Sequence, residues 1–288
     1  MEYINDNCYV IQADSIAELA ALEISSINQD REMARTNFHP QWARRKGLKW
    51  LGVETIDGVK KLTERGWPEG LAKAESILDA NRLTVPKMKT VKRKRRRGAF
   101  GDSIDIHRVN NGDLNRAWEY RKREAGMPRK GDHVILASNI GATVNVTSEQ
   151  MFWRGAVTTI AADMIERSGR SVKIIGYSWS EGVYPRSPVH SCKTILKVKD
   201  YSDSLDMESV ITMLGLAGFF RYYVFKSRLS APFKASNGLG TTVHRVPQEV
   251  VDKNAVVIDI TDVWNENGAQ QFLNSLESRL VVKEGVAA

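Results

Sequence analysis

Two patterns of hydrophobic positions alternate in the C-terminal half of the chain. β-Branched and aromatic residues gather in short runs that are typical of strands, at residues 133–146, 172–179, 194–199 and 256–260. Between these runs, apolar residues recur at intervals of three and four, which predicts helices over residues 149–168, 206–228 and 266–280. Strands and helices in this order predict the α/β fold class, with an open, mostly parallel sheet flanked by helices.

The N-terminal part shows helical patterns instead. Apolar residues at helical spacing predict three helices, over residues 14–27, 55–65 and 68–81. Gly66 can end the second of these, and Pro68 fits the first turn of the third. We therefore expect a helical N-terminal region over residues 1–83.

Residues 84–131 differ from both flanking regions. A helix does not continue easily through Pro86, and glycines follow the basic residues that come next. We expect a basic arm and linker over residues 84–131, whose first part, 84–103, is an exposed arm or hairpin. The α/β domain then occupies residues 132–288.

The surplus positive charge lies in one short segment. Of the eleven residues 87–97, none is acidic and eight are basic: Lys87, Lys89, Lys92, Arg93, Lys94, Arg95, Arg96 and Arg97. The formal net charge is +8, from 42 lysines and arginines against 34 acidic residues, so the chain without these eight cations is neutral. A neutral body with one concentrated cationic segment is typical of contact with a polyanion, so these residues are candidates to bind phosphates. A solvated loop or a localisation signal is the alternative.

Two further clusters combine cations with aromatic rings. In the first, Arg44, Arg45 and Lys46 follow Trp42, an arrangement that suits base stacking and phosphate contact. The alternative is that the rings of this segment belong to the core.

The second cluster lies nearer to the basic segment. Arg121, Lys122 and Arg123 follow Trp118 and Tyr120, and these cations could extend the same nucleic-acid surface. An ordinary charged helix is the alternative, and the sequence does not decide between the two.

The sequence carries few signs of catalysis. It has no phosphate-binding glycine loop, no HExxH and no GxSxG, and Cys8 and Cys192 are too far apart in sequence for a CxxC pair. We therefore expect no cofactor and no metal. Asp102, Asp105 and Asp113 could hold a metal for nuclease chemistry, although aspartates among glycines are more typical of turns.

The chain also lacks the features of secreted and membrane proteins. Acidic residues stand near the N-terminus where a signal peptide would carry lysines, and no apolar stretch reaches the roughly 18 residues of a membrane span. We expect a cytoplasmic protein with no membrane contact.

The C-terminal half resembles a von Willebrand factor A type domain. The similarity rests on strand 133–138, the helix after it and strand 172–179, an order that is also Rossmann-like. That family binds a metal through an Asp-x-Ser-x-Ser loop after its first strand. Here the corresponding residues, Ser138 to Ala142, contain no aspartate, so the chain resembles a degenerate member without the metal site.

The whole chain resembles a group of uncharacterised tailed-bacteriophage proteins. The shared motifs are a Gly-Trp-Pro-Glu-Gly element, Gly66 to Gly70, and an Arg-Gly-Ala element, Arg154 to Ala156, which the resemblance places at a helix start. The resemblance supplies no activity, and it implies a phage protein that works in the host cytoplasm.

Together, these patterns predict a non-catalytic nucleic-acid-binding protein. The chain has no helix-turn-helix, zinc finger or basic zipper, so we expect a single-stranded DNA or RNA ligand, held through phosphates and stacked bases. One alternative is a protein-interaction module that binds a phage or host protein, and another is a metal-dependent nuclease. The sequence also leaves open a homo-oligomer.

Overall fold

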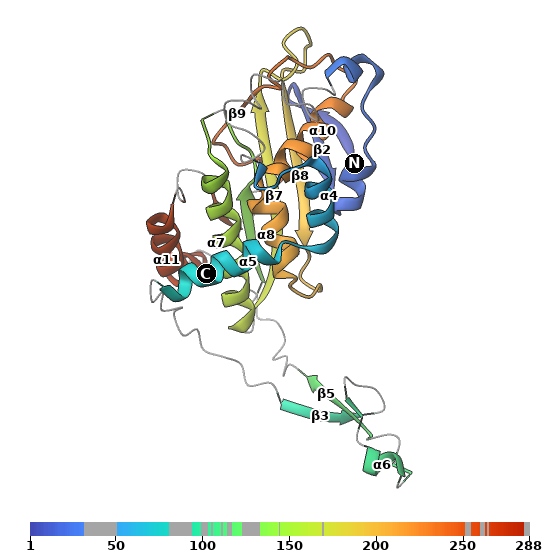
Figure 1. Cartoon of the computed structure of the whole chain (residues 1–288), viewed down its shortest axis with the longest axis vertical. Helices are drawn as coiled ribbons and strands as arrows, with labels where there is room; N and C mark the ends of the chain where they lie inside the picture. The colour runs from blue at the N-terminus through green and yellow to red at the C-terminus, as the bar shows by residue number, and fades with distance from the viewer. Residues whose placement is uncertain are drawn as a thin grey trace.

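The computed structural model describes residues 1–31, 51–80, 94–98, 103–104, 106–110, 112–113, 117–122, 133–143, 145–168, 170–250, 255–259, 263 and 265–284. Two sheets organise these residues, and Figure 1 shows the smaller one apart from the larger. The smaller sheet has three strands and the larger has seven. We call the larger sheet with its helices the body, and the smaller sheet with helix α6 the arm.

The body is an open α/β sheet flanked by helices, which confirms the predicted fold class. Its strands are β1 (Glu2–Asn5), β2 (Cys8–Ala13), β6 (His133–Asn139), β7 (Ser171–Glu181), β8 (Ser191–Lys199), β9 (Thr241–Thr242) and β10 (Ala255–Ile258). Six of them follow the order β1-β2-β8-β7-β6-β10, and β9 pairs with β7. Along this path the pairs β2–β8, β7–β6 and β6–β10 are parallel. The two remaining pairs, β1–β2 and β8–β7, are antiparallel.

The N-terminal hairpin β1–β2 was missed by the helical prediction for residues 1–83. Asp6 and Asn7 form its two-residue turn with φ values of 45° and 59°, and positive φ at both central residues is typical of the tight turns that join antiparallel strands. Val10 and Ile11 in β2 are fully buried, so this hairpin belongs to the sheet. The boundaries at residues 83 and 131 stay predictions.

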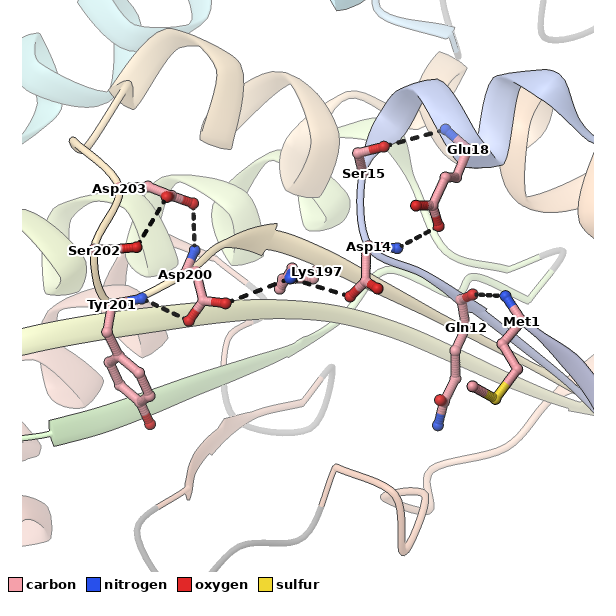
Figure 2. A network of polar contacts seen from close by, with 10 residues as sticks. All are labelled: Met1, Gln12, Asp14, Ser15, Glu18, Lys197, Asp200, Tyr201, Ser202 and Asp203. Atoms are coloured by element: carbon pink, nitrogen blue, oxygen red, sulfur yellow. Dashed lines mark hydrogen bonds and ion pairs between the residues drawn. The ribbon is translucent and has the colours of Figure 1, made fainter.

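Polar contacts join the two ends of the hairpin and link the residue after it to β8, as Figure 2 shows. The Met1 ammonium donates to the Gln12 carbonyl oxygen at 2.6 Å. The Lys197 Nζ of β8 lies 3.1 Å from an oxygen of Asp14 and 3.4 Å from one of Asp200. Ser15 then caps the helix that follows by accepting from the Glu18 amide.

Helices lie on one side of the sheet, some of them packed on other helices. They are α1 (Ile16–Ala21), the 3₁₀ helix η1 (Ser26–Arg31), α4 (Ile56–Arg65), α5 (Pro68–Ala80), α7 (Ser148–Arg167), α8 (Met207–Gly215), α9 (Ala217–Phe219), the π-helical η4 (Phe220–Val224), α10 (Phe225–Ser230) and α11 (Glu266–Glu284). Figure 1 shows α7 and α8 in front of β7 and β8. Apolar residues of these helices and of the strands form one continuous core.

The single helix predicted over residues 206–228 is wrong. The chain leaves helical geometry at Leu216, whose φ of −81° and ψ of 113° are extended, and it continues through α9, η4 and α10. Both sides of the break are apolar, so hydrophobic spacing gave no sign of it. The single helix predicted over residues 14–27 is likewise two short elements, α1 and η1.

The two motifs of the phage resemblance lie where elements of this core pack closely against one another. Gly66 ends α4 with a φ of 87°, and the Trp67 ring meets Phe152 edge-on with centroids 5.8 Å apart. Gly155 lies against α8, where an added Cβ would come within 2.3 Å of the Gly215 Cα. Arg154 lies within α7 and not at its start.

The other face of the sheet carries a smaller apolar cluster. Ile135, Ile175 and Ile195 are buried there, with Val250 from the segment before β10 packed on them. No helix that the structure describes is long and apolar enough to cross a membrane.

Candidate nucleic-acid interface

Strand pairing in the arm brings two basic segments of the sequence together. The arm strands are β3 (Lys94–Gly98), β4 (Ser103–Ile104) and β5 (Trp118–Lys122), in the order β3-β5-β4. β3 and β5 are antiparallel, so the end of the predicted basic segment lies beside the second cation cluster. The alternative of a charged helix at residues 118–122 is therefore wrong, because these residues form the central strand of this sheet.

The register of this pair sets cations against cations. Lys94 is opposite Lys122, and Arg95 is opposite Arg121. Residues directly opposite in an antiparallel pair have Cβ atoms about 4.5–5.5 Å apart, and like charges at that distance destabilise the pair. We name these four residues, with Arg96 and Arg97, the cation ladder.

Both faces of the arm sheet receive cations from the ladder. Successive residues of a strand alternate between faces, so Lys94 and Arg96 share one face with Lys122 and Tyr120. Arg95, Arg97 and Arg121 share the other face, where Glu119 pairs with Arg97. One acidic residue thus stands against six basic ones in the described residues of β3 and β5.

Local contacts fix the chain between β4 and β5. Helix α6 (Ile106–Asn110) ends where the Asp113 amide donates to the Arg108 carbonyl and the Gly112 amide donates to the Val109 carbonyl, at 2.9 and 3.0 Å. Gly112 has a φ of 77°, so this is a Schellman-type helix end. The Asp113 carboxylate also lies 2.6 Å from an Arg108 guanidinium nitrogen. Asp113, one of the three aspartates considered for a nuclease metal, is therefore part of an ion pair.

Two buried lysines of the body have acidic partners. Lys193 lies 3.1 Å from Glu249, and Lys199 lies 2.8 Å from Glu166. Both lysines are almost fully buried, where a charge without a partner would be costly.

Two buried arginines of the body depend on carbonyl and hydroxyl oxygens. Arg154 donates to the carbonyl oxygens of Asn139 and Gly141, and Arg228 donates to the Leu239 carbonyl and the Ser178 hydroxyl at 2.9 and 3.0 Å. Burial lowers the pKa of each guanidinium to about 10, which leaves both charged at neutral pH.

The loop after β6 shows no metal-binding cluster. Asn139 donates to the Asp259 carboxylate at 2.9 Å and accepts from the Gly141 amide at 2.8 Å, so its side chain orders the loop. In the described part of the chain, no three His, Cys, Asp or Glu residues gather closely enough to hold a metal. The degenerate von Willebrand factor A resemblance stays a prediction.

Several predicted site residues lie outside the described residues: Lys87, Lys89, Lys92, Arg93, Arg123, Arg44, Arg45, Lys46 and Trp42. The structure places the backbone of the other six, Lys94, Arg95, Arg96, Arg97, Arg121 and Lys122, in one antiparallel pair. Sequence analysis did not find this pairing, because cations on both strands carry no alternating hydrophobic signal.

An α/β body with a basic β-sheet arm is thus the class that the structure defines. The family model "Domain of unknown function (DUF7192)" matches residues 3–283, so the chain belongs to the DUF7192 family. Neither the curated proteins nor the solved structures contain a match.

Proposed function

We propose that this protein binds nucleic acid through the cation ladder of its arm. The supporting observation is the β3–β5 register, which sets Lys94 against Lys122 and Arg95 against Arg121. A phosphate between two such cations would offset their repulsion, and cations that contact phosphates release bound counterions. Without the eight cations of residues 87–97 the rest of the chain is neutral, which favours the arm as the contact surface and the body as its support.

The sequence predicted a single-stranded ligand because it has no helix-turn-helix, zinc finger or basic zipper, the usual modules that bind duplex DNA. The β3–β5 pair is a candidate for such a module, because a two-stranded β-ribbon is a known way to enter a groove of DNA and β4 pairs only with the Trp118 end of β5. Binding to phosphates is therefore the core of the proposal. We also propose that the protein works in the cytoplasm, as the sequence predicts, and in the host cytoplasm, as the resemblance to phage proteins implies.

Fluorescence anisotropy with labelled single-stranded DNA, single-stranded RNA and duplex DNA tests this proposal. The test variant replaces four ladder cations by glutamine: Lys94→Gln, Arg95→Gln, Arg96→Gln and Arg97→Gln. The matched control removes four exposed cations of the body: Lys61→Gln, Arg65→Gln, Arg186→Gln and Arg245→Gln.

We expect the native protein and the control to bind at low salt and the ladder variant to bind much more weakly. Equal loss in both variants would show a nonspecific charge effect and contradict the proposal. Absence of binding by the native protein to all three ligands would overturn it and favour a protein partner. Magnesium-dependent cleavage of the labelled ligand would indicate the nuclease alternative instead.

A further inference from the structure

Two exposed isoleucines lie in the arm. Among the described residues, five large apolar side chains are strongly exposed, and two of them are Ile104, at 47%, and Ile106, at 65%. Ile104 ends β4 and Ile106 begins α6. Figure 1 shows α6 at the far end of the arm from the body. A single exposed isoleucine needs no explanation, but two within three positions form an apolar tip.

The register relates this apolar tip to the cation ladder. Ile104 pairs with Trp118, which is at one end of β5, and Lys122 is at the other end. From Lys94 to Arg97 the ladder covers three steps of strand, or about 10 Å at 3.3 Å per residue. Since phosphates of one DNA strand are about 3.4 Å apart along the axis, this length corresponds to about three phosphate spacings. The arm therefore presents a row of cations followed by an apolar end.

Cations on both faces favour a ligand that surrounds the ribbon. Lys94 and Arg96 stand on one face, while Arg95 and Arg97 stand on the other. A single strand that lies along one face would leave the cations of the other face without phosphates. A groove of duplex DNA has phosphates on both walls, and the part of the arm where residues 94–96 pair with 120–122 is two-stranded, as such a groove admits.

We propose that the arm enters a groove of duplex DNA and that Ile104 and Ile106 insert as an apolar wedge at a base step, which bends the duplex. This inference rests on the proposed function and names its ligand. DNA-bending proteins commonly combine basic ribbons or arms with inserted apolar side chains, because partial unstacking yields a bent duplex that contacts more protein. The wedge also gives the exposed isoleucines an apolar environment in the complex.

The test measures binding and bending on the same molecule. A duplex of about 25 base pairs carries a donor and an acceptor dye at its two ends, so bending raises energy transfer while anisotropy reports binding. The variant is Ile104→Ser with Ile106→Ser. The control is Ile27→Ser, at an isoleucine of the body that is 44% exposed. Because both arm isoleucines are exposed, we expect thermal melting of the variant to match that of the native protein.

We expect the native protein and Ile27→Ser to raise energy transfer on binding. The arm variant should still bind, within a fewfold of the native affinity, and should lose the rise. A duplex that is already flexible at a mismatch should bind the native protein about tenfold more tightly than a matched duplex, and this preference should vanish in the arm variant.

The outcomes separate the two proposals. Duplex binding without bending, or bending that the serine variant retains, overturns the wedge and leaves the proposed function standing. Tighter binding to single strands than to duplex overturns the groove placement. Absence of binding to any nucleic acid overturns both.

Discussion

The body pairs buried lysines with carboxylates, whereas the β3–β5 pair of the arm sets basic residues opposite basic residues. In the body, the buried lysines Lys193 and Lys199 meet the carboxylates of Glu249 and Glu166. At the surface, Lys197 lies between Asp14 and Asp200 (Figure 2). In the arm, strand register sets Lys94 against Lys122 and Arg95 against Arg121.

This difference indicates whether the positive charges of each region are neutralised by residues of the chain or by a ligand. The buried lysines of the body have carboxylate partners within the chain, so removal of a partner should change stability. The register sets basic residues opposite basic residues in the ladder, an arrangement that disfavours strand pairing, so we expect removal of these residues to change binding and leave the stability of the body unchanged.

The largest expected effect comes from breaking a buried ion pair of the body. Glu249→Gln leaves the Lys193 ammonium without its carboxylate in a site where the two side chains are only 8% and 11% exposed. We expect the free energy of unfolding to fall by about 3–5 kcal/mol, measured by urea denaturation. The double variant Lys193→Met with Glu249→Gln should recover part of this loss. If Glu249→Gln alone were as stable as the native protein, the Lys193–Glu249 ion pair would not stabilise the body.

A second change tests the packing that holds the body together. Gly155→Ala places a Cβ within 2.3 Å of the Gly215 Cα, so α7 and α8 must move apart. We expect a loss of about 1–3 kcal/mol in the free energy of unfolding, with nucleic-acid binding at the native level below the melting transition. Gly238→Ala is the control, because nothing lies within 4 Å of its added Cβ. Equal stability of the two variants would show that the helices do not meet at Gly155.

A third change converts repulsion into attraction within the arm. Arg121→Glu sets an acid against Arg95, and an opposite pair should stabilise the β3–β5 pairing by about 0.2–1 kcal/mol. We expect slower amide hydrogen exchange in β3 and β5 together with weaker binding to nucleic acid. Adding Arg95→Glu restores a like-charged pair and should reverse the gain in protection. Unchanged exchange in the single variant would contradict this register.

The smallest effect concerns the surface network of Figure 2. The Tyr201 amide donates to the Asp200 carboxylate at 2.8 Å, and this hydrogen bond, with Lys197 nearby, lowers the pKa of Asp200. A lowered pKa stabilises the fold above the ordinary value of about 4, and this contribution is lost as the pH falls through the lowered pKa. Because the site is exposed, Asp200→Asn should cost under about 1 kcal/mol at pH 7 and nothing at pH 2. Equal costs at both pH values would show that ionisation of Asp200 plays no part.

The sequence predicted part of the body, where burial imposes a period on hydrophobic residues, and it missed the hairpin β1–β2. The helices α4, α5, α7 and α11 and the strands β7 and β8 lie where their patterns placed them. The break at Leu216 escaped detection because both sides of it are apolar.

The arm was only partly predictable. Charge density marked residues 87–97 as a contact surface, while Pro86 and the glycines after the basic residues predicted an arm or hairpin. The partner strand Trp118–Lys122 lies about 20 residues further along the chain, and a pairing between two charged strands has no apolar face to reveal its register. Six of the fifteen candidate residues could be placed, all of them in this pair.

The salt dependence of binding tests the central claim most directly. Anisotropy titrations of the native protein, the four-glutamine ladder variant and the four-glutamine body control give the slope of log affinity against log salt concentration. Each phosphate contact contributes about 0.9 to this slope on duplex DNA, so we expect a steep slope for the native protein and the control, reduced by about 3–4 in the ladder variant. Equal slopes for all three proteins would contradict the assignment of the phosphate contacts to the arm.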